Sequence, residues 1–166
     1  MKHHKPTETA EKLINIAETM FAEKGFYGTS IKNLADGLAI AKSTLLHHFH
    51  TKEKLYGEVL KKLASEMTEE VRDIRKQFTD EKQQILAFVQ LLCDNSNKKP
   101  NRESILLREL LDNPKRADKA KKWFFADYYQ ELTDIIRSGQ AKGIFKPVTS
   151  FAGICMPCEK SMASIP

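Results

Sequence analysis

Residues 29–49 read TSIKNLADGLAIAKSTLLHHF, and apolar residues recur at helical spacing on each side of a break near residues 39–40. Thr29 can accept hydrogen bonds from free backbone N–H groups as the N-cap of the first segment. The stretch therefore predicts two short helices, over residues 29–38 and 41–49, joined by a tight turn. Two short helices in this arrangement form a helix-turn-helix.

The segments on both sides of this stretch also have helical patterns. Upstream, the apolar members of residues 10–21 fall on one face, and Thr7 or Thr9 can act as the N-cap. Gly25 can end that helix in the left-handed conformation. Downstream, Thr51 can cap a helix of about 26 residues, roughly 39 Å long. A helix of that length is expected to link two units.

The rest of the chain predicts further helices and no convincing strand. Asp80 can cap a helix that reaches Cys93, and residues 95–101 are expected to form a polar loop. Two more helices are expected over residues 105–111 and from about residue 116 to 140. The fold class predicted from these patterns is all-α.

Composition limits the cellular setting and the partners. The 166 residues are 41% hydrophobic, which is enough for a core, and no apolar run approaches the ~20 residues that span a bilayer. Three cysteines without a secretory signal predict a reducing, cytoplasmic location and no membrane partner. The net charge of +5 permits an acidic partner but does not by itself require one, because a solvated surface explains it as well.

The second short helix carries the functional prediction. In a helix-turn-helix the second helix enters the major groove of DNA and presents its N-terminal half to base edges. Its outward-facing residues are expected to be Lys42, Ser43, Thr44, His47 and His48.

Several motifs in and around this stretch share one register with a known family. They are Phe21-Ala-Glu-Lys-Gly25-Phe26, Thr29-Ser30-Ile31, Leu34-Ala35, Thr44-Leu45, His47-His48-Phe49 and Lys52-Glu53-Lys54-Leu55. Over about residues 8–62 this pattern resembles the N-terminal domain of TetR-type (tetracycline-repressor-like) transcriptional regulators. Residues 139–145 resemble the exit of that family's long seventh helix.

The resemblance implies a three-helix DNA-binding domain, residues 1–51, and a helical effector-binding and dimerisation domain, residues 52–166. It also implies a homodimer, held by C-terminal helices that include part of residues 116–166, on two-fold symmetric double-stranded operator DNA. The regulator is expected to be a repressor that a small hydrophobic effector releases from DNA.

Site residues follow from the resemblance. Ser30 and Lys52 match phosphate-contacting positions, and Lys42 and Lys54 are expected to join them. The recognition-helix residues Ser43, Thr44, His47 and His48 are expected to approach bases. Phosphate contacts fix the register of a protein on DNA, whereas base contacts give specificity.

Four features depart from the family pattern. Ala39 stands at a turn position usually held by Gly, Ala41 at the usual Ser or Thr N-cap, and Leu46 at the usual phosphate-binding Tyr. Loss of the N-cap is expected to cost ~1 kcal/mol. These substitutions predict weaker or more plastic DNA contact. The tail, residues 150–166, offers at most one helix where the family normally has two.

An apolar cavity for the effector is expected between the long helix and the three helices that follow it. Its candidate wall residues are Met67, Val71, Val89, Trp123 and Tyr128. No cofactor and no metal are expected, and the chain shows no nucleophile motif, phosphate-cradling loop or paired acids, so we predict no enzymatic activity.

Two other classes of function stay open. The protein could be a helical thiol or metal sensor that uses Cys93, Cys155 and Cys158, or a degenerate helix-turn-helix protein that binds a protein partner. The Cys155-Met-Pro-Cys158 spacing is weak evidence for a metal site, because no second pair of ligands accompanies it.

Overall fold

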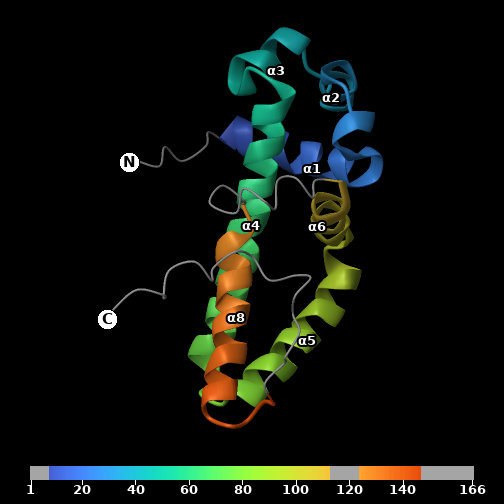
Figure 1. Ribbon diagram of the computed structural model, residues 1–166. Coiled ribbons are helices and arrows are strands. Elements are labelled where there is room, and N and C mark those ends of the chain that lie inside the picture. The colour runs from blue at the N-terminus through green and yellow to red at the C-terminus, as the bar shows by residue number, and fades with distance from the viewer. Residues whose placement is uncertain (1–7, 113–123, 147–166) are drawn as a thin grey trace, which may run out of the picture. The chain divides into compact units, whose positions relative to one another are not determined.

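The computed structural model describes residues 8–112 and 124–146 of the chain. In those residues it contains helices and no strand, which confirms the predicted all-α fold class (Figure 1). The helices are α1 (Glu8–Gly28), α2 (Ile31–Gly37), α3 (Lys42–Phe49), α4 (Lys52–Gln77), α5 (Glu81–Lys98), α6 (Pro100–Asp112) and α8 (Ala126–Ala141). No helix in this described part is long and apolar enough to span a bilayer.

The chain divides into two compact units. Unit 1 comprises Met1–Leu63 and Asn95–Arg108, and unit 2 comprises Ala64–Asp94 and Glu109–Pro166. The long helix α4 contributes its first part to unit 1 and its second part to unit 2. The predicted domain boundary at residues 51 and 52 stays a prediction.

Unit 1 is built around apolar residues of α1 to α4. Leu34 and Leu45, one from each short helix, are both 0% exposed, and Phe21 of α1 contacts the ring of Tyr56 of α4 edge-on at 4.8 Å between centroids. Fully burying a side chain of this size contributes roughly 1.5–3 kcal/mol. The helix-turn-helix is thus fixed from its apolar side.

The junction between α1 and α2 differs from the prediction in one detail. Gly25 leaves helical geometry at φ 70° and ψ 174°, as expected, although a last turn follows it to Gly28. The N-cap of α2 is Ser30, whose Oγ accepts from the Asn33 N–H at 3.0 Å, so the prediction of Thr29 was wrong. Thr29 is buried instead, and its hydroxyl donates to the Gly25 carbonyl at 2.8 Å.

The turn between α2 and α3 adopts the conformation that its sequence disfavours. Ala39 has φ 51°, a left-handed conformation that costs a non-glycine residue about 1 kcal/mol or more. Ala41 is the N-cap of α3 and offers no side-chain hydrogen bond, as its sequence predicts. The two helices, Ile31–Gly37 and Lys42–Phe49, lie within the predicted ranges.

The predicted caps of the later helices are confirmed, but one predicted loop is wrong. Thr51 Oγ1 accepts from the Lys54 N–H at 3.2 Å, and Asp80 Oδ2 accepts from the Gln83 N–H at 3.0 Å. Residues 95–101 were expected to form a polar loop, whereas α5 continues to Lys98 and α6 begins at Pro100. Proline suits the first position of a helix, because its missing N–H would have no helical partner there.

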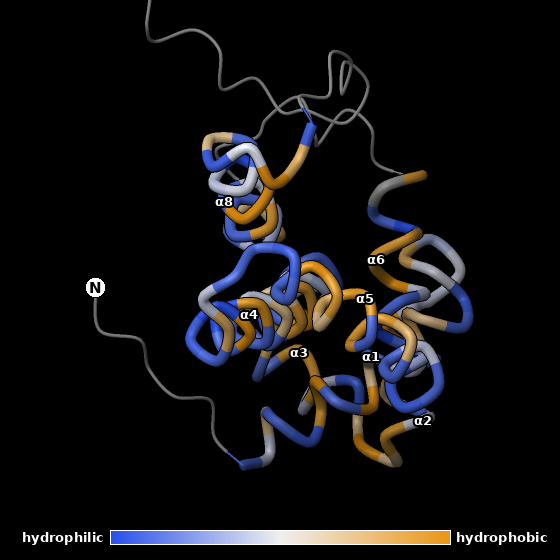
Figure 2. Tube along the Cα trace, turned by 90° about the horizontal axis from the view of Figure 1, so that it is seen from below, coloured by the Kyte–Doolittle hydropathy of each residue, from blue (hydrophilic) through white to orange (hydrophobic). Residues whose placement is uncertain are grey.

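In unit 2, α8 lies beside the second part of α4, as the views in Figures 1 and 2 agree. Glu131 of α8 accepts from Arg72 Nε at 2.8 Å and also pairs with Arg75. Gly139 lies against the ring of Phe145, where a Cβ atom would clash. The expected exit of this helix near residues 139–143 is confirmed, and its expected start near residue 116 lies outside the described residues.

Candidate nucleic-acid interface

Helix α3 separates its side chains into a buried and an exposed face. Leu45 and Phe49 are 0% and 7% exposed, and they hold the helix against the core of unit 1. On the other face Lys42, Ser43, Thr44 and His47 are exposed. Four of the five predicted recognition-helix residues are therefore exposed, three of them in the first turn of α3 and His47 in its last turn.

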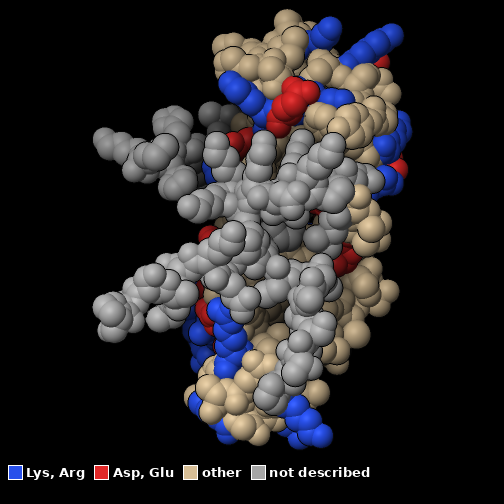
Figure 3. Space-filling view, in the orientation of Figure 1, with Lys and Arg blue, Asp and Glu red and all other residues tan. Residues whose placement is uncertain are grey.

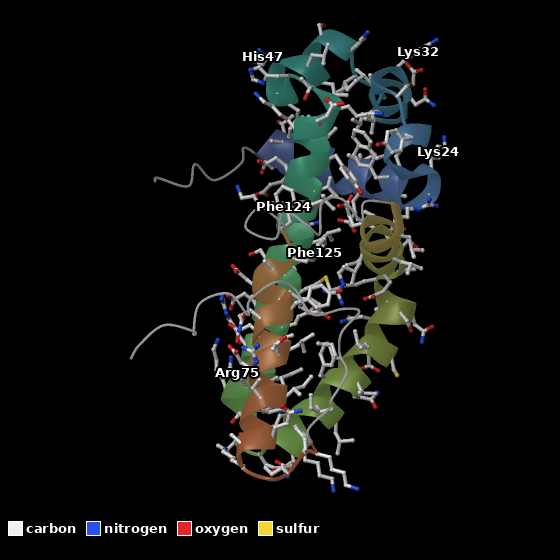
Figure 4. All side chains as sticks on the ribbon, in the orientation of Figure 1. Lys24, Lys32, His47, Arg75, Phe124 and Phe125 are labelled. Atoms are coloured by element: carbon white, nitrogen blue, oxygen red, sulfur yellow. The ribbon has the colours of Figure 1, made fainter. Side chains whose placement is uncertain are left out.

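The two histidines of α3 differ in their surroundings. His47 is exposed and projects outward, as its label in Figure 4 shows. His48 is half-buried, with its ring centroid 5.7 Å from that of His47 and 6.1 Å from that of Phe49. His48 therefore presents less of its imidazole to a partner than His47 does.

Ser30 has the exposure expected of a phosphate contact but already has a local role. Its hydroxyl caps α2 and donates to Asn33 Oδ1. An exposed hydroxyl can exchange such a donor bond for a phosphate oxygen while it still accepts from the Asn33 N–H.

The two lysines at the start of α4 differ in their surroundings. Lys54 is exposed, whereas Lys52 is half-buried and donates to the carbonyls of Phe26 and Thr29, each at 2.9 Å. Between them, Glu53 is exposed, and its own backbone N–H and the Thr51 hydroxyl hold the pKa of its carboxyl below the usual range. Glu53 therefore stays anionic near neutral pH and offsets part of the positive charge.

Two further exposed lysines of unit 1 were not among the predicted site residues. Lys24 near the end of α1 and Lys32 in the first turn of α2 are exposed, and Lys32 projects from the same end of unit 1 as His47 (Figure 4). Figure 3 shows Lys and Arg side chains projecting around the end of unit 1 that carries α2 and α3. The signal available in the sequence was the excess of lysine in residues 1–62, which hold ten Lys and seven acidic residues.

The contact between Arg108 and α1 was also not predicted, because nothing in the sequence relates the two. Arg108 lies on α6, and its guanidinium donates to the carbonyls of Ala22 and Glu23 at 3.3 Å each. These are carbonyls near the end of α1, where the helix dipole is negative and a cation is favoured.

The candidate effector residues are only partly brought together. Met67, Val71 and Tyr128 are buried in unit 2, at 1%, 0% and 4% exposure. Val89 is 49% exposed on α5, so it is not buried with these three residues, and its place in a cavity wall stays a prediction. Trp123 lies outside the described residues.

Of the three cysteines proposed for a thiol or metal sensor, the described residues include Cys93. Cys93 is exposed, and Cys155 and Cys158 lie outside the described residues. Within the ranges 8–112 and 124–146, no group of three His, Cys, Asp or Glu residues could hold a metal ion.

Comparisons with known proteins agree with this geometry. The family model described as "Bacterial regulatory proteins, tetR family" matches residues 13–59. The HTH-type transcriptional repressor KstR2 of Rhodococcus jostii is 32% identical over 78 residues, which are 47% of this chain and 38% of that protein. The HTH-type transcriptional repressor NicS of Pseudomonas putida is 27% identical over 143 residues, 83% of this chain and 66% of that protein.

A solved structure extends the likeness to most of the fold. The ketosteroid transcriptional regulator KstR2 of Mycobacterium tuberculosis superposes with a TM-score of 0.64 at 21% identity, over 88% of this chain and 75% of that chain. In sequence, the chain spans less than two thirds of the length of the curated relatives named above. These matches confirm the family resemblance drawn from the motifs.

Proposed function

Because residues 13–59 match the family model of the tetR regulators, we propose that the protein is a ligand-responsive transcriptional repressor. It binds two-fold symmetric operator DNA as a homodimer and leaves the DNA when a small hydrophobic molecule binds. The same proposal places it in the cytoplasm and gives it neither a catalytic reaction nor a cofactor.

The observation that carries the proposal is the division of α3 into two faces. Leu45 and Phe49 fix one face to the core, and the other presents Lys42, Ser43 and Thr44 at the start of the helix. The first turn of α3 contains no acidic residue that would repel phosphate. A helix of eight residues with this polarity fits the major groove, which admits an α-helix.

Roles follow from chemistry and exposure. Ser30, Lys42 and Lys54 contact phosphates, since they supply exposed hydroxyl or ammonium donors. Ser43, Thr44 and His47 approach base edges, where Ser and Thr can donate or accept. His48 lies at the margin of this contact.

The effector side rests on the buried residues of unit 2. Met67, Val71 and Tyr128 supply an apolar interior, and the Tyr128 ring lies 6.3 Å from that of Phe88. An effector acts by binding the DNA-incompetent arrangement more tightly than the competent one. A regulator named for ketosteroids and one named for fatty acid degradation share this fold, which supports a hydrophobic class of ligand.

The DNA proposal is tested by selecting duplexes from a random pool with the purified protein and measuring affinity for the selected sequence. We expect the selected duplex to bind at least 100-fold more tightly than a scrambled one, with affinity falling steeply as salt rises because bound counterions are released. Equal affinity for both duplexes at every salt concentration would contradict the proposal.

A matched pair of variants separates the recognition helix from the rest of the surface. Thr44→Leu should weaken binding to the selected duplex by about tenfold or more while leaving the scrambled duplex nearly unchanged, because a base contact is lost. Thr79→Leu places the same change at an exposed site of unit 2 and should affect neither. Equal losses in both variants would point away from α3.

The effector proposal is tested with a steroid ketone and a long-chain fatty acid as probes. Release of the protein from the selected duplex by either probe, together with a rise in its melting temperature, is the expected result. Release by neither probe would remove the support for a hydrophobic effector of these kinds but leave DNA binding intact.

A further inference from the structure

The ammonium group of Lys52 makes three contacts within unit 1. It donates to the Phe26 carbonyl and to the Thr29 carbonyl, each at 2.9 Å. The same nitrogen lies 4.1 Å from the centroid of the Phe26 ring, within the range of a cation–π contact. Three contacts thus hold the side chain toward the end of α1.

These contacts join the two ends of the helix-turn-helix. Thr29 immediately precedes Ser30, the N-cap of α2. Lys52 is the first residue of α4, three residues after α3 ends at Phe49. The bond from Lys52 to the Thr29 carbonyl therefore closes a loop of 23 residues in sequence separation that contains α2, the turn and α3.

The first end of this loop is itself anchored. Thr29 is 1% exposed, and its hydroxyl donates to the Gly25 carbonyl at 2.8 Å. The carbonyl that Lys52 reaches is therefore attached to a fixed point of α1. A cation that holds this carbonyl determines where α2 begins relative to the start of α4.

The geometry leaves little of Lys52 for DNA. An ammonium has three N–H donors and no acceptor, and two of the three are directed at backbone carbonyls. Turning the group toward a phosphate would break both of these charge-assisted bonds, which are the stronger kind. Lys54, two residues further along α4, is exposed, so its ammonium can turn toward a phosphate without leaving a buried partner.

We propose that Lys52 is a positioning residue that clasps the two ends of the helix-turn-helix and acts on DNA affinity through the placement of α3, not through contact with phosphate. The DNA part of this inference rests on the proposed function. The clasp itself is a property of the free protein, so it can be tested without DNA.

The first experiment uses the unmodified protein and measures the acetylation rate of each lysine by mass spectrometry. Without DNA, Lys52 should react at least tenfold more slowly than Lys54, because its nitrogen must leave two carbonyls before it reacts. Equal rates without DNA, followed by protection of Lys52 only when DNA is added, would overturn the clasp. Since no variant is needed, a failure to fold cannot obscure the result.

The second experiment compares Lys52→Met with Lys54→Met as a matched loss of one charge. Methionine keeps an apolar stem over the Phe26 ring but removes the donors. Lys52→Met should increase amide hydrogen exchange at Asn33 and Leu34, whose N–H groups are bonded to Ser30, at least tenfold. It should also weaken specific DNA binding at least tenfold, with the slope of log affinity against log salt unchanged. Lys54→Met should leave exchange unchanged and lower that slope by about 1.

The outcomes separate the two proposals. A slope lowered by about 1 in Lys52→Met, or unchanged exchange in that variant, overturns the clasp. Slow acetylation and faster exchange in a protein that binds no DNA sequence specifically support the clasp and contradict the proposed function. Lys52→Arg, which keeps two directed donors, should restore at least part of the exchange protection.

Discussion

The two units differ in the groups that pair with the Lys and Arg side chains linking their helices. In unit 1, Lys52 and Arg108 reach backbone carbonyls at the end of α1. In unit 2, cations reach carboxylates: Arg72 and Arg75 pair with Glu131, and Lys142 pairs with Glu81 at 2.5 Å. A carbonyl does not titrate, whereas a carboxylate does, so the two sets of contacts should respond differently to acid.

The two kinds of partner also differ in how freely they can move. Lys62 of unit 1 differs from Lys52 and Arg108, because it pairs with the carboxylate of Glu18 at 2.9 Å. At the α1–α2 junction itself the partners are main-chain atoms, whose positions follow the helix. In unit 2 both partners of each pair are side chains, so α8 is attached through groups that can change rotamer and protonation.

The largest expected effect tests whether the units are separate in stability. Leu45→Ala removes a side chain that is 0% exposed and should lower the free energy of unfolding by about 2–5 kcal/mol. Hydrogen exchange should rise in α2 and α3 before it rises in α8. The neighbouring Leu46→Ala, at a half-exposed position, is the control and should cost much less. Equal loss of protection in α3 and α8 would contradict the two-unit comparison.

A smaller effect should appear on acidification of unit 2. Lys142, then Ser138 and the backbone N–H of Glu81 hold the pKa of the Glu81 carboxyl at about 2, below its ordinary 4.5. Because the folded pKa is the lower one, Glu81 stabilises the fold above pH 4.5, and this stabilisation is lost as the pH falls from 4.5 toward 2.

The measurement is the melting temperature of the wild type and of Glu81→Gln from pH 7 to pH 3. The wild type should melt at the higher temperature at pH 7, and the gap should narrow below pH 4.5. A gap that stays constant over this range would show that the carboxylate charge contributes nothing.

Arg108→Ala tests whether a contact to carbonyls in unit 1 is independent of pH. The two bonds of 3.3 Å from Arg108 to α1 carbonyls are long, so the expected loss is about 1 kcal/mol of unfolding free energy. That loss should be the same at pH 5 and pH 7, since its carbonyl partners do not titrate. Chemical denaturation at the two pH values decides this, and a loss that changes with pH would assign Arg108 a carboxylate partner.

The smallest expected effect concerns the histidines of α3. If imidazoles near phosphate gain charge, DNA affinity should increase a few-fold as the pH falls from about 7.5 to 6. The double variant His47→Ala, His48→Ala should lose this dependence in DNA titrations over the same range. Identical pH profiles for both proteins would remove the histidine role and leave the lysine roles untouched.

Most of the fold could be predicted from the sequence because its signals are local. The apolar spacing of α4, the caps Thr51 and Asp80, and the uncapped Ala41 each depend on residues within one or two turns. The exchange of Thr29 for Ser30 as N-cap shows the limit of such reasoning. Both residues can cap, and burial of Thr29 against the Gly25 carbonyl decides between them.

The candidate site was harder to predict where its contacts are distant in sequence. The exposed face of α3 follows from helical period alone, but the partners of Lys52 and Arg108 lie 23 to 86 residues away. Val89 shows the same limit in unit 2, because the helical spacing of the apolar residues in α5 does not say which face of the helix meets the interior. The polar composition of residues 95–101 suggested a loop, although Asn95 is buried and accepts from the Lys99 N–H at 2.7 Å within a helical segment.

Ala39 gives the turn between α2 and α3 the mechanics of a stiff hinge. A glycine would hold φ 51° without strain and would allow the hinge a wide range of other angles, whereas alanine permits few. Alanine therefore restricts the angle between the two helices more than glycine would, in contrast to the more plastic contact predicted from the sequence. A DNA groove that does not match this angle must deform itself, so the energy of adapting protein to operator falls on the nucleic acid.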